Sequence, residues 1–178
     1  TVTAQWTAKQ YTITFDTDGG STVADITAAY GAAITAPANP TKTGYEFVGW
    51  DPELPGTMPL NGMTVKAQWT AASGTAYTVE HYFQNIEDDT YSEDASQQQT
   101  LKGTTGASTE ATAKTVAGFT AKTVEQQKIA ADGSTVVKVY YDRNSYTLTY
   151  VLGNGAADDE KTVKYGATIA APAEPVRE

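Results

Sequence analysis

The sequence predicts a mainly β protein that is built from small modules in tandem and contains little helix. Three observations lead to this fold class. Short segments such as Tyr11–Asp16 and Met63–Trp69 alternate apolar and polar residues with a period of two, which is typical of half-buried strands. Turn sequences such as Asp18-Gly19-Gly20 separate these segments. Two stretches of the chain also occur twice, which indicates a repeat array.

The repeats set the expected domain organisation. Residues 11–40 return at 146–175 with a constant shift of 135 (146 − 11) and no gap, and thirteen of the thirty aligned pairs are identical. Residues 1–8 return at 64–71 with a single difference. We therefore expect the last strand of one unit (1–9), a complete unit (10–71), a module of a different kind (76–143) and the first half of a further unit (145–178).

Length and composition limit the functions that are open to this chain of 178 residues. Modules of roughly 60 to 70 residues are near the lower limit for an independent hydrophobic core, so we expect each to depend on its neighbours. The net charge of −9 disfavours nucleic acids and anionic membranes as partners. No run approaches the roughly 18 apolar residues of a membrane span, so no membrane insertion of this fragment is expected. The absence of cysteine excludes disulfides and thiolate metal sites.

In the complete unit we expect four strands, at Tyr11–Asp16, Thr22–Tyr30, Tyr45–Trp50 and Met63–Trp69. Thr1–Thr7 alternates in the same way and is expected to be a strand. The expected core consists of the large apolar residues on the inward faces: Tyr11, Ile13, Phe15, Tyr45, Phe47, Trp50, Val65 and Trp69. A sugar-stacking platform of exposed rings is the alternative reading of the aromatic members, but so small a module needs its few large rings for burial.

In the second module the expected strands are Tyr77–Gln84, Gln97–Leu101, Phe119–Ile129 and Ser134–Asp142. Thr109–Lys114 is the best helix candidate of the chain. Residues 85–94 carry five acidic side chains and are expected to form a solvated hairpin loop, with binding of a divalent ion as the alternative.

The complete unit closely resembles the Listeria–Bacteroides repeat, the B-repeat family of internalins. The features shared with that family are a Gly-Gly turn after the first strand, Tyr30-Gly31, a Pro-x-x-Pro-x-x-x-Gly-Tyr-x-Phe-x-Gly-Trp core that ends at Trp50, and a terminal Ala-Gln-Trp69. The complete unit has Asp18 where the family usually has Asn, and the half copy reads Gly153-Asn-Gly at the same turn.

Residues 77–141 more loosely resemble MucBP-like (mucin-binding-protein) modules. The shared features are Tyr77-Thr-Val-x-His-Tyr-Phe, a Gly103-x-x-Gly106 step, Val-Ala-Gly-Phe119 and a Val-x-Val-Tyr-Tyr141 ending. Together the two resemblances imply β-grasp-like (ubiquitin-like) small α+β modules in an elongated row. They imply an extracellular location on the cell wall of a Gram-positive bacterium, and they carry no catalytic residues.

The residue inventory argues against an enzyme and against a resident cofactor. There is no cysteine, and the one histidine, His81, lies within a predicted strand, where a partly buried structural histidine is expected. Asp16 and Asp18 have the spacing of the first ligands of a calcium loop, but the downstream glycine and bidentate glutamate are missing. We therefore expect a plain turn there and no metal site. Lys138 and Asn144 lie near strand ends, as isopeptide partners do, but nothing singles them out as a pair.

Tyr82, Tyr91 and Tyr140 are the best candidates for ligand contact, because they lie off the predicted core faces. The expected function is a non-enzymatic stalk or spacer of a cell-surface protein that projects a head domain and whose partners are the neighbouring repeats. The alternative is an adhesin that binds host mucin or glycan through residues 76–143. The chain is expected to be a monomer, with end-to-end pairing of its terminal segments as a further hypothesis.

Overall fold

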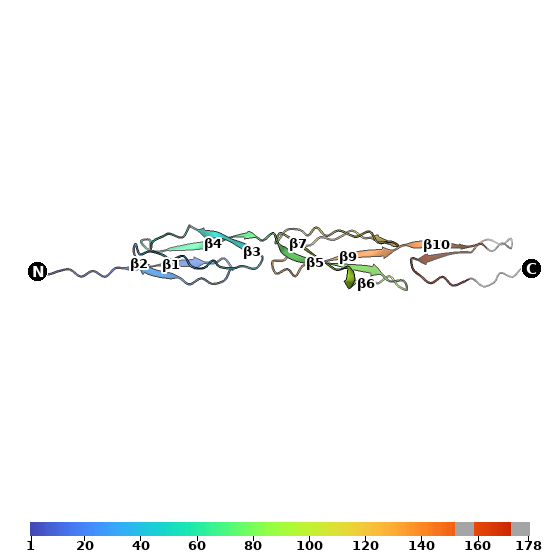
Figure 1. Ribbon diagram of the computed structural model, residues 1–178, viewed down its shortest axis with the longest axis horizontal. Helices are drawn as coiled ribbons and strands as arrows, with labels where there is room; N and C mark the ends of the chain where they lie inside the picture. The colour runs from blue at the N-terminus through green and yellow to red at the C-terminus, as the bar shows by residue number, and fades with distance from the viewer. Residues whose placement is uncertain (152–158, 172–178) are drawn as a thin grey trace, which may run out of the picture. The chain divides into compact units, whose positions relative to one another are not determined.

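The computed structural model describes residues 1–151 and 159–171, which form two compact units. The first unit holds residues 1–75 and two short later segments, 103–107 and 129–133. The second unit holds the intervening residues and the C-terminal part of the chain. Figure 1 labels most of their strands.

The first unit contains one four-stranded sheet with the order β2-β1-β4-β3. The two central strands, β1 and β4, are parallel, and each edge strand is antiparallel to its neighbour. The bounds are β1 Gln10–Asp16, β2 Ile26–Ala29, β3 Tyr45–Asp51 and β4 Met63–Ala71, so all four predicted strands are present, the second shortened to four residues.

The core of the first unit lies on one face of this sheet. Ile13 and Val65 from the central strands are fully buried, as is Met58 from the loop before β4. That loop forms a short irregular ladder with the loop after β2, in which Met58 exchanges backbone hydrogen bonds with Gly31 and Ala32 at 2.9 and 2.8 Å. Two irregular loops therefore cover the sheet where many small α+β folds place a helix.

Tyr45 is a correction to the predicted core, since it is 37% exposed. The strand that it begins contains a bulge between Phe47 and Gly49. A bulge adds one residue to one strand and shifts the alternation of faces. Phe47 and Trp50 therefore meet edge to face, at 5.2 Å between ring centroids, although they are three residues apart.

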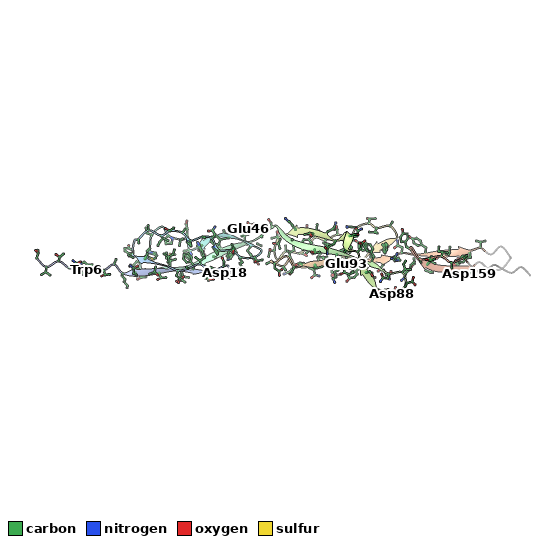
Figure 2. The ribbon with its side chains drawn as sticks, turned by 60° about the horizontal axis from the view of Figure 1, so that its bottom comes forward. Trp6, Asp18, Glu46, Asp88, Glu93 and Asp159 are labelled. Atoms are coloured by element: carbon green, nitrogen blue, oxygen red, sulfur yellow. The ribbon has the colours of Figure 1, made fainter. Side chains whose placement is uncertain are left out.

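The prediction of a strand at Thr1–Thr7 is wrong for this structure. Residues 1–9 have no strand assignment, and Val2 and Trp6 are almost fully exposed (Figure 2). An alternating segment becomes a strand only when another strand pairs with it. No described residue pairs with residues 1–9 as a strand.

The second unit contains a sheet with the order β6-β5-β9-β8, and β7 also pairs with β5. Its central strands, β5 and β9, are again parallel, and β6 and β8 are antiparallel to them. The bounds are β5 Thr75–Gln84, β6 Tyr91–Glu93, β7 Gln99–Gly103, β8 Phe119–Ala121 and β9 Val136–Arg143.

Thr109–Lys114 is not helical, which corrects the helix prediction. The segment runs irregularly over the buried face of the second sheet, where Ala111 is buried and the amides of Glu110 and Lys114 donate to tyrosine hydroxyls. The expected strand after Gly118 is also shorter than predicted and ends at Ala121. Within the described residues, the one helix is a three-residue 3-10 turn, Ala95–Gln97, and no helix is long enough to span a membrane.

The last described element is a hairpin of β10 Ser145–Tyr150 and β11 Asp159–Lys164. Its register repeats that of β1 and β2 under the shift of 135, since Tyr146 faces Val163 as Tyr11 faces Ala28. The Gly153-Asn-Gly turn of the half copy and its last prolines lie outside the described residues.

Candidate functional site

The three tyrosines predicted for ligand contact lie together on one face of the second sheet. Tyr82 on β5 and Tyr140 on β9 are register partners, and their ring centroids are 5.2 Å apart. Tyr91 on β6 meets Tyr140 nearly perpendicularly, also at 5.2 Å. All three side chains are half-buried. We call this surface the tyrosine face.

Charged groups surround the tyrosine face. The Tyr82 hydroxyl donates to Glu80 at 2.8 Å, and this bond raises the pKa of Tyr82. Lys138 lies over the Tyr82 ring, 5.1 Å from its centroid. A cation over an aromatic face is attracted by the ring quadrupole.

A second set of charges lies beside Tyr91. Its hydroxyl donates to Asp142, which also forms an ion pair with Lys122 at 3.2 Å. The hydrogen bond from Tyr91, followed by the hydrogen bond and charge of Lys122, lowers the pKa of Asp142. The ammonium group of Lys122 lies 4.8 Å from the Tyr91 ring centroid. The face thus combines ring surfaces, carboxylate acceptors and ammonium donors. Lys122 and Lys138 already lie over two of the rings, so a ligand that stacks there competes with them for the ring surface.

A hollow of about 390 Å³ lies elsewhere on the second unit and was not predicted from the sequence. Phe83 and Phe119 form an apolar wall, with ring centroids 5.0 Å apart, and the Arg143 guanidinium lies 4.6 Å from the Phe119 ring. Its other lining residues are Asn85, Ser92, Glu93, Asp94, Gln97 and Val116. Glu93 is labelled in Figure 2.

His81 is fully buried. Its Nδ1 lies 2.8 Å from the Tyr141 hydroxyl, which also accepts a hydrogen bond from the Lys114 amide. A hydroxyl oxygen can accept two hydrogen bonds and donate one, so the imidazole tautomer decides whether Tyr141 donates to Nδ1 or accepts from it. Within the described residues, Nε2 is the one buried side-chain nitrogen or oxygen without a hydrogen-bond partner. Burial, followed by the charge of Lys114, lowers the pKa of this histidine.

Asp16 and Asp18 lie at the turn after β1, where the Asp18 charge is paired with two lysines. The Asp18 amide donates to the Asp16 carboxylate at 3.0 Å. The Asp18 carboxylate forms ion pairs with Lys66 at 2.9 Å and with Lys42 at 3.4 Å, and the hydrogen bond from Lys66 is the main cause of its lowered pKa. Among the described residues, no group of three His, Cys, Asp or Glu side chains is arranged to hold a metal ion.

Two of the three tryptophans of the first unit, Trp50 and Trp69, are engaged in packing. Trp50 meets Phe15 edge to face at 4.9 Å, and Trp69 meets Phe47 at 5.5 Å. The Trp69 indole also donates to the Thr17 carbonyl at 3.1 Å. Both tryptophans are half-buried, so they stabilise the sheet and leave only part of each ring exposed.

The candidate isopeptide residues have other contacts. Asn144 Oδ1 accepts a hydrogen bond from the Thr120 hydroxyl at 2.7 Å, while the Lys138 ammonium lies over Tyr82.

Several known proteins are similar to parts of this chain. A Gly-rich protein of Evansella cellulosilytica, described as a membrane protein, is 45% identical over 47 residues, 26% of this chain and 5% of its own length. A second protein of that organism, also described as a membrane protein, is 27% identical over 191 aligned residues, covering 100% of this chain and 28% of its own length. Internalin H of Listeria monocytogenes is 40% identical over 79 residues, 39% of this chain and 14% of its own length. The chain therefore spans a small part of each of these relatives.

A solved structure of SHIRT domains 3–4 (Streptococcal High Identity Repeats in Tandem) from a cell surface protein is 17% identical, with a TM-score of 0.26, over 75% of this chain and 98% of that one. A TM-score this low does not establish a shared fold. The Listeria-Bacteroides repeat domain matches residues 11–77 and 146–178, which together make up more than half of the chain. This chain therefore belongs to the Listeria-Bacteroides repeat domain family.

Proposed function

We propose that this chain is part of a non-enzymatic spacer in a bacterial cell-surface protein, where repeats joined end to end hold a head domain away from the cell wall of a Gram-positive organism. The observation that carries the proposal is the repetition itself: the β10–β11 hairpin reproduces the register of β1–β2, and in the sequence a different module separates the two. Repeat proteins of this kind add length with copy number, and their stability is roughly a sum over units and junctions.

We also propose that both modules are β-grasp variants. In each, the first and last strands form the central parallel pair, β1 with β4 and β5 with β9, and the other strands flank them. Irregular loops take the place of the crossing helix.

Small-angle X-ray scattering tests the spacer proposal. The 178-residue chain would be compared with a tandem chain in which residues 1–144 run directly into residues 10–178, which preserves the 135-residue period. We expect the maximum dimension to grow by the length of one added period. A tandem chain that scatters as a compact particle would overturn the proposal.

A second candidate function is binding of mucin or another host glycan through the tyrosine face. The convergence of Tyr82, Tyr91 and Tyr140 on one surface favours it, as does the resemblance of residues 77–141 to MucBP-like modules. Aromatic rings stack on the apolar faces of sugars, and carboxylates such as Glu80 accept hydrogen bonds from hydroxyl groups.

Binding of the chain to a panel of purified mucins and soluble glycans tests this second candidate. The variant Tyr82→Ala/Tyr91→Ala/Tyr140→Ala is compared with a matched triple variant of exposed tyrosines, Tyr30→Ala/Tyr45→Ala/Tyr146→Ala. We expect saturable binding that only the first variant loses, with circular dichroism unchanged. Absence of binding at high micromolar concentration, or equal loss in both variants, would contradict a role for the tyrosine face.

We propose further that the chain is a monomer, and that end-to-end pairing of its terminal segments is weak. Residues 14–16 of β1 pair with residues 64–66 of β4. In the repeats, residues 14–16 correspond to 149–151 and residues 64–66 correspond to 1–3. The same register would therefore pair residues 149–151 of one copy with residues 1–3 of a second copy. Three pairs are a short strand contact. We expect sedimentation to give a monomer at micromolar concentration, and a stable dimer there would contradict this.

A further inference from the structure

Tyr165 and Gly166 form the turn that follows β11, and this turn contacts the preceding module within the second unit. The Tyr165 ring meets Phe119 edge to face, with centroids 6.1 Å apart. It also lies against Gly118, where a Cβ atom would overlap the ring. Gly118 has a φ of +79°, so glycine is favoured there by conformation and by space. We call Gly118, Phe119 and Arg143 the tyrosine seat.

Arg143 joins the turn to the end of the module. Its Nη1 donates to the Tyr165 carbonyl at 2.9 Å, and its Nε donates to the Gln84 carbonyl at 2.9 Å. The guanidinium also lies 4.6 Å from the Phe119 ring centroid. One side chain thus ties together β5, β8 and the turn after β11.

The single residue between β9 and β10 is fixed from both sides. The Asn144 amide donates to the Gly118 carbonyl at 2.9 Å, and the Asn144 carbonyl accepts from the Tyr165 amide at 2.7 Å. Lys164 adds a further link, because its ammonium donates to the Asp88 carbonyl at 2.9 Å and forms an ion pair with Asp89 at 3.3 Å. Asp88 is labelled in Figure 2.

These contacts supply packing that the hairpin lacks by itself. β10 and β11 form a two-stranded sheet by themselves. An isolated two-stranded hairpin is marginally stable in water at best. We therefore expect the stability of the hairpin to depend on its contacts with the tyrosine seat.

The complete repeat has the same turn without a seat in this chain. Tyr30 and Gly31 correspond to Tyr165 and Gly166 under the shift of 135, and Gly31 and Gly166 have φ values of 76° and 77°. The Tyr30 amide donates to the Lys9 carbonyl at 3.3 Å, as the Tyr165 amide does to Asn144. Tyr30 is 64% exposed, compared with 42% for Tyr165.

We infer that the Tyr-Gly turn is the element by which a repeat docks on the module before it, and that the Tyr30 turn takes the same seat when a second copy of module 76–143 is placed before it. Residues 1–8 repeat residues 64–71, the end of a unit of the 10–71 kind, so in this chain the Tyr30 turn does not follow module 76–143. The tandem chain described above supplies that module. This inference rests on the proposed spacer function. The occupant is identified by the seat that Tyr165 already uses, a glycine and a phenylalanine beside an arginine. Position 29 is alanine where the half copy has Lys164, so docking at Tyr30 relies on the tyrosine without the lysine link.

Hydrogen exchange of backbone amides, followed by mass spectrometry, tests the seat in the 178-residue chain. Tyr165→Ala is expected to speed exchange in residues 145–150 by about tenfold or more, because the hairpin loses its aromatic contact. Tyr146→Ala is the matched control, since this exposed tyrosine lies on the same hairpin outside the contacts described. Equal exchange in Tyr165→Ala and the unmodified chain would overturn the inference.

The tandem chain tests the docking surface. In it, the second copy of Tyr30 follows directly on a copy of module 76–143. Tyr30→Ala in that copy is expected to speed exchange in its β1 and β2, whereas Tyr30→Ala in the single chain is expected to change nothing. The inference is overturned if the substitution is silent in both chains or equally costly in both.

The two proposals fail separately. A tandem chain that scatters as a compact particle but keeps the Tyr30 effect refutes the spacer and leaves the docking contact. A chain that lengthens by one period without the Tyr30 effect refutes the docking surface and leaves the spacer.

Discussion

The two sheets share a strand order around a central parallel pair, but they fill the buried side of that pair differently. In the first sheet the fully buried central residues are apolar, Ile13 and Val65. In the second sheet, valines share the buried face with His81 and Tyr141, which are joined by a hydrogen bond. The same topology therefore tolerates either a purely apolar centre or one with a buried titratable pair. We therefore expect the two sheets to respond differently to substitution and to pH.

The largest effect is expected from Ile13→Ala, which removes apolar volume from the centre of the first sheet. We expect a loss of about 2–5 kcal/mol in the free energy of unfolding of that sheet, because the cavity cannot close fully. Hydrogen exchange resolved by strand would show faster exchange in β1 and β4 and unchanged exchange in β5 and β9. Thr12→Ala, at an exposed position on the same strand, is the control. Equal acceleration in both sheets would show that they do not unfold independently.

A smaller effect is expected from Tyr141→Phe in the second sheet. This substitution leaves the Lys114 amide and His81 Nδ1 without the hydroxyl that pairs with both. A buried polar group left unsatisfied costs about 1–3 kcal/mol. Tyr140→Phe, on the opposite face of the same strand, is the control and is expected to be milder. A urea titration that gives equal midpoints for the two variants would contradict the buried pair.

Mild acid is expected to destabilise the second sheet and spare the first. Burial lowers the pKa of His81 below its ordinary value of 6.5, so the unfolded chain binds the proton more readily. Stability is therefore full above that value and falls as the pH drops toward the lowered pKa, by at most about 1.4 kcal/mol per pH unit. Lys114 adds to the lowering, while Gln99 and Asp94 oppose it. The first sheet contains no histidine.

Unfolding midpoints measured between pH 7 and pH 5 would test this prediction. The control is His81→Gln, which lacks the titrating group and is expected to give a flatter dependence for the second sheet. A dependence that survives this substitution would assign the effect to other groups.

The smallest effect is expected from Asp18→Asn in the first sheet. The carboxylate is exposed and pairs with Lys42 and Lys66 at the surface, where ion pairs contribute little. We expect a slight decrease in the urea midpoint that disappears in 1 M salt, where the screening length is about 3 Å. A decrease that persists in high salt would indicate that the turn itself depends on this aspartate.

The strands were predictable because alternation survives wherever one face is buried. The central strands β1, β4, β5 and β9 were all found from their sequence, as was the duplication of the hairpin. The exposure of Tyr45 could not be derived, because alternation places it on the face of Phe47 and gives no sign that it lies at the end of the strand. The bulge after Phe47, which brings Trp50 to the same face, depends on the pairing with β4 and has no separate signal in the sequence. Thr109–Lys114 failed as a helix because tertiary hydrogen bonds to Tyr77 and Tyr141 replace helical ones.

The candidate sites likewise include features that the sequence predicted and features that it did not. Alternation alone placed Tyr82 and Tyr140 off the core face, but their contact depends on the parallel register of β5 and β9, which the sequence does not specify. Lys122 and Asp142, which flank the tyrosines, were not singled out for the same reason, and Lys138 was considered only as an isopeptide residue. The seat for Tyr165 also joins segments that are far apart in the chain, so no local pattern signals it.

The parallel central pair also determines how each module would carry tension. A pull on the two ends of residues 10–71 enters at the start of β1 and leaves at the end of β4, so the load runs along the two strands. The four register pairs between residues 13–16 and 63–66 then resist together, whereas a hairpin pulled from its open end yields pair by pair. The second sheet has six such pairs, from Thr78 and Val136 to Phe83 and Tyr141. Shear loading of this kind would give the modules mechanical strength in a chain that has no cysteine with which to cross-link itself.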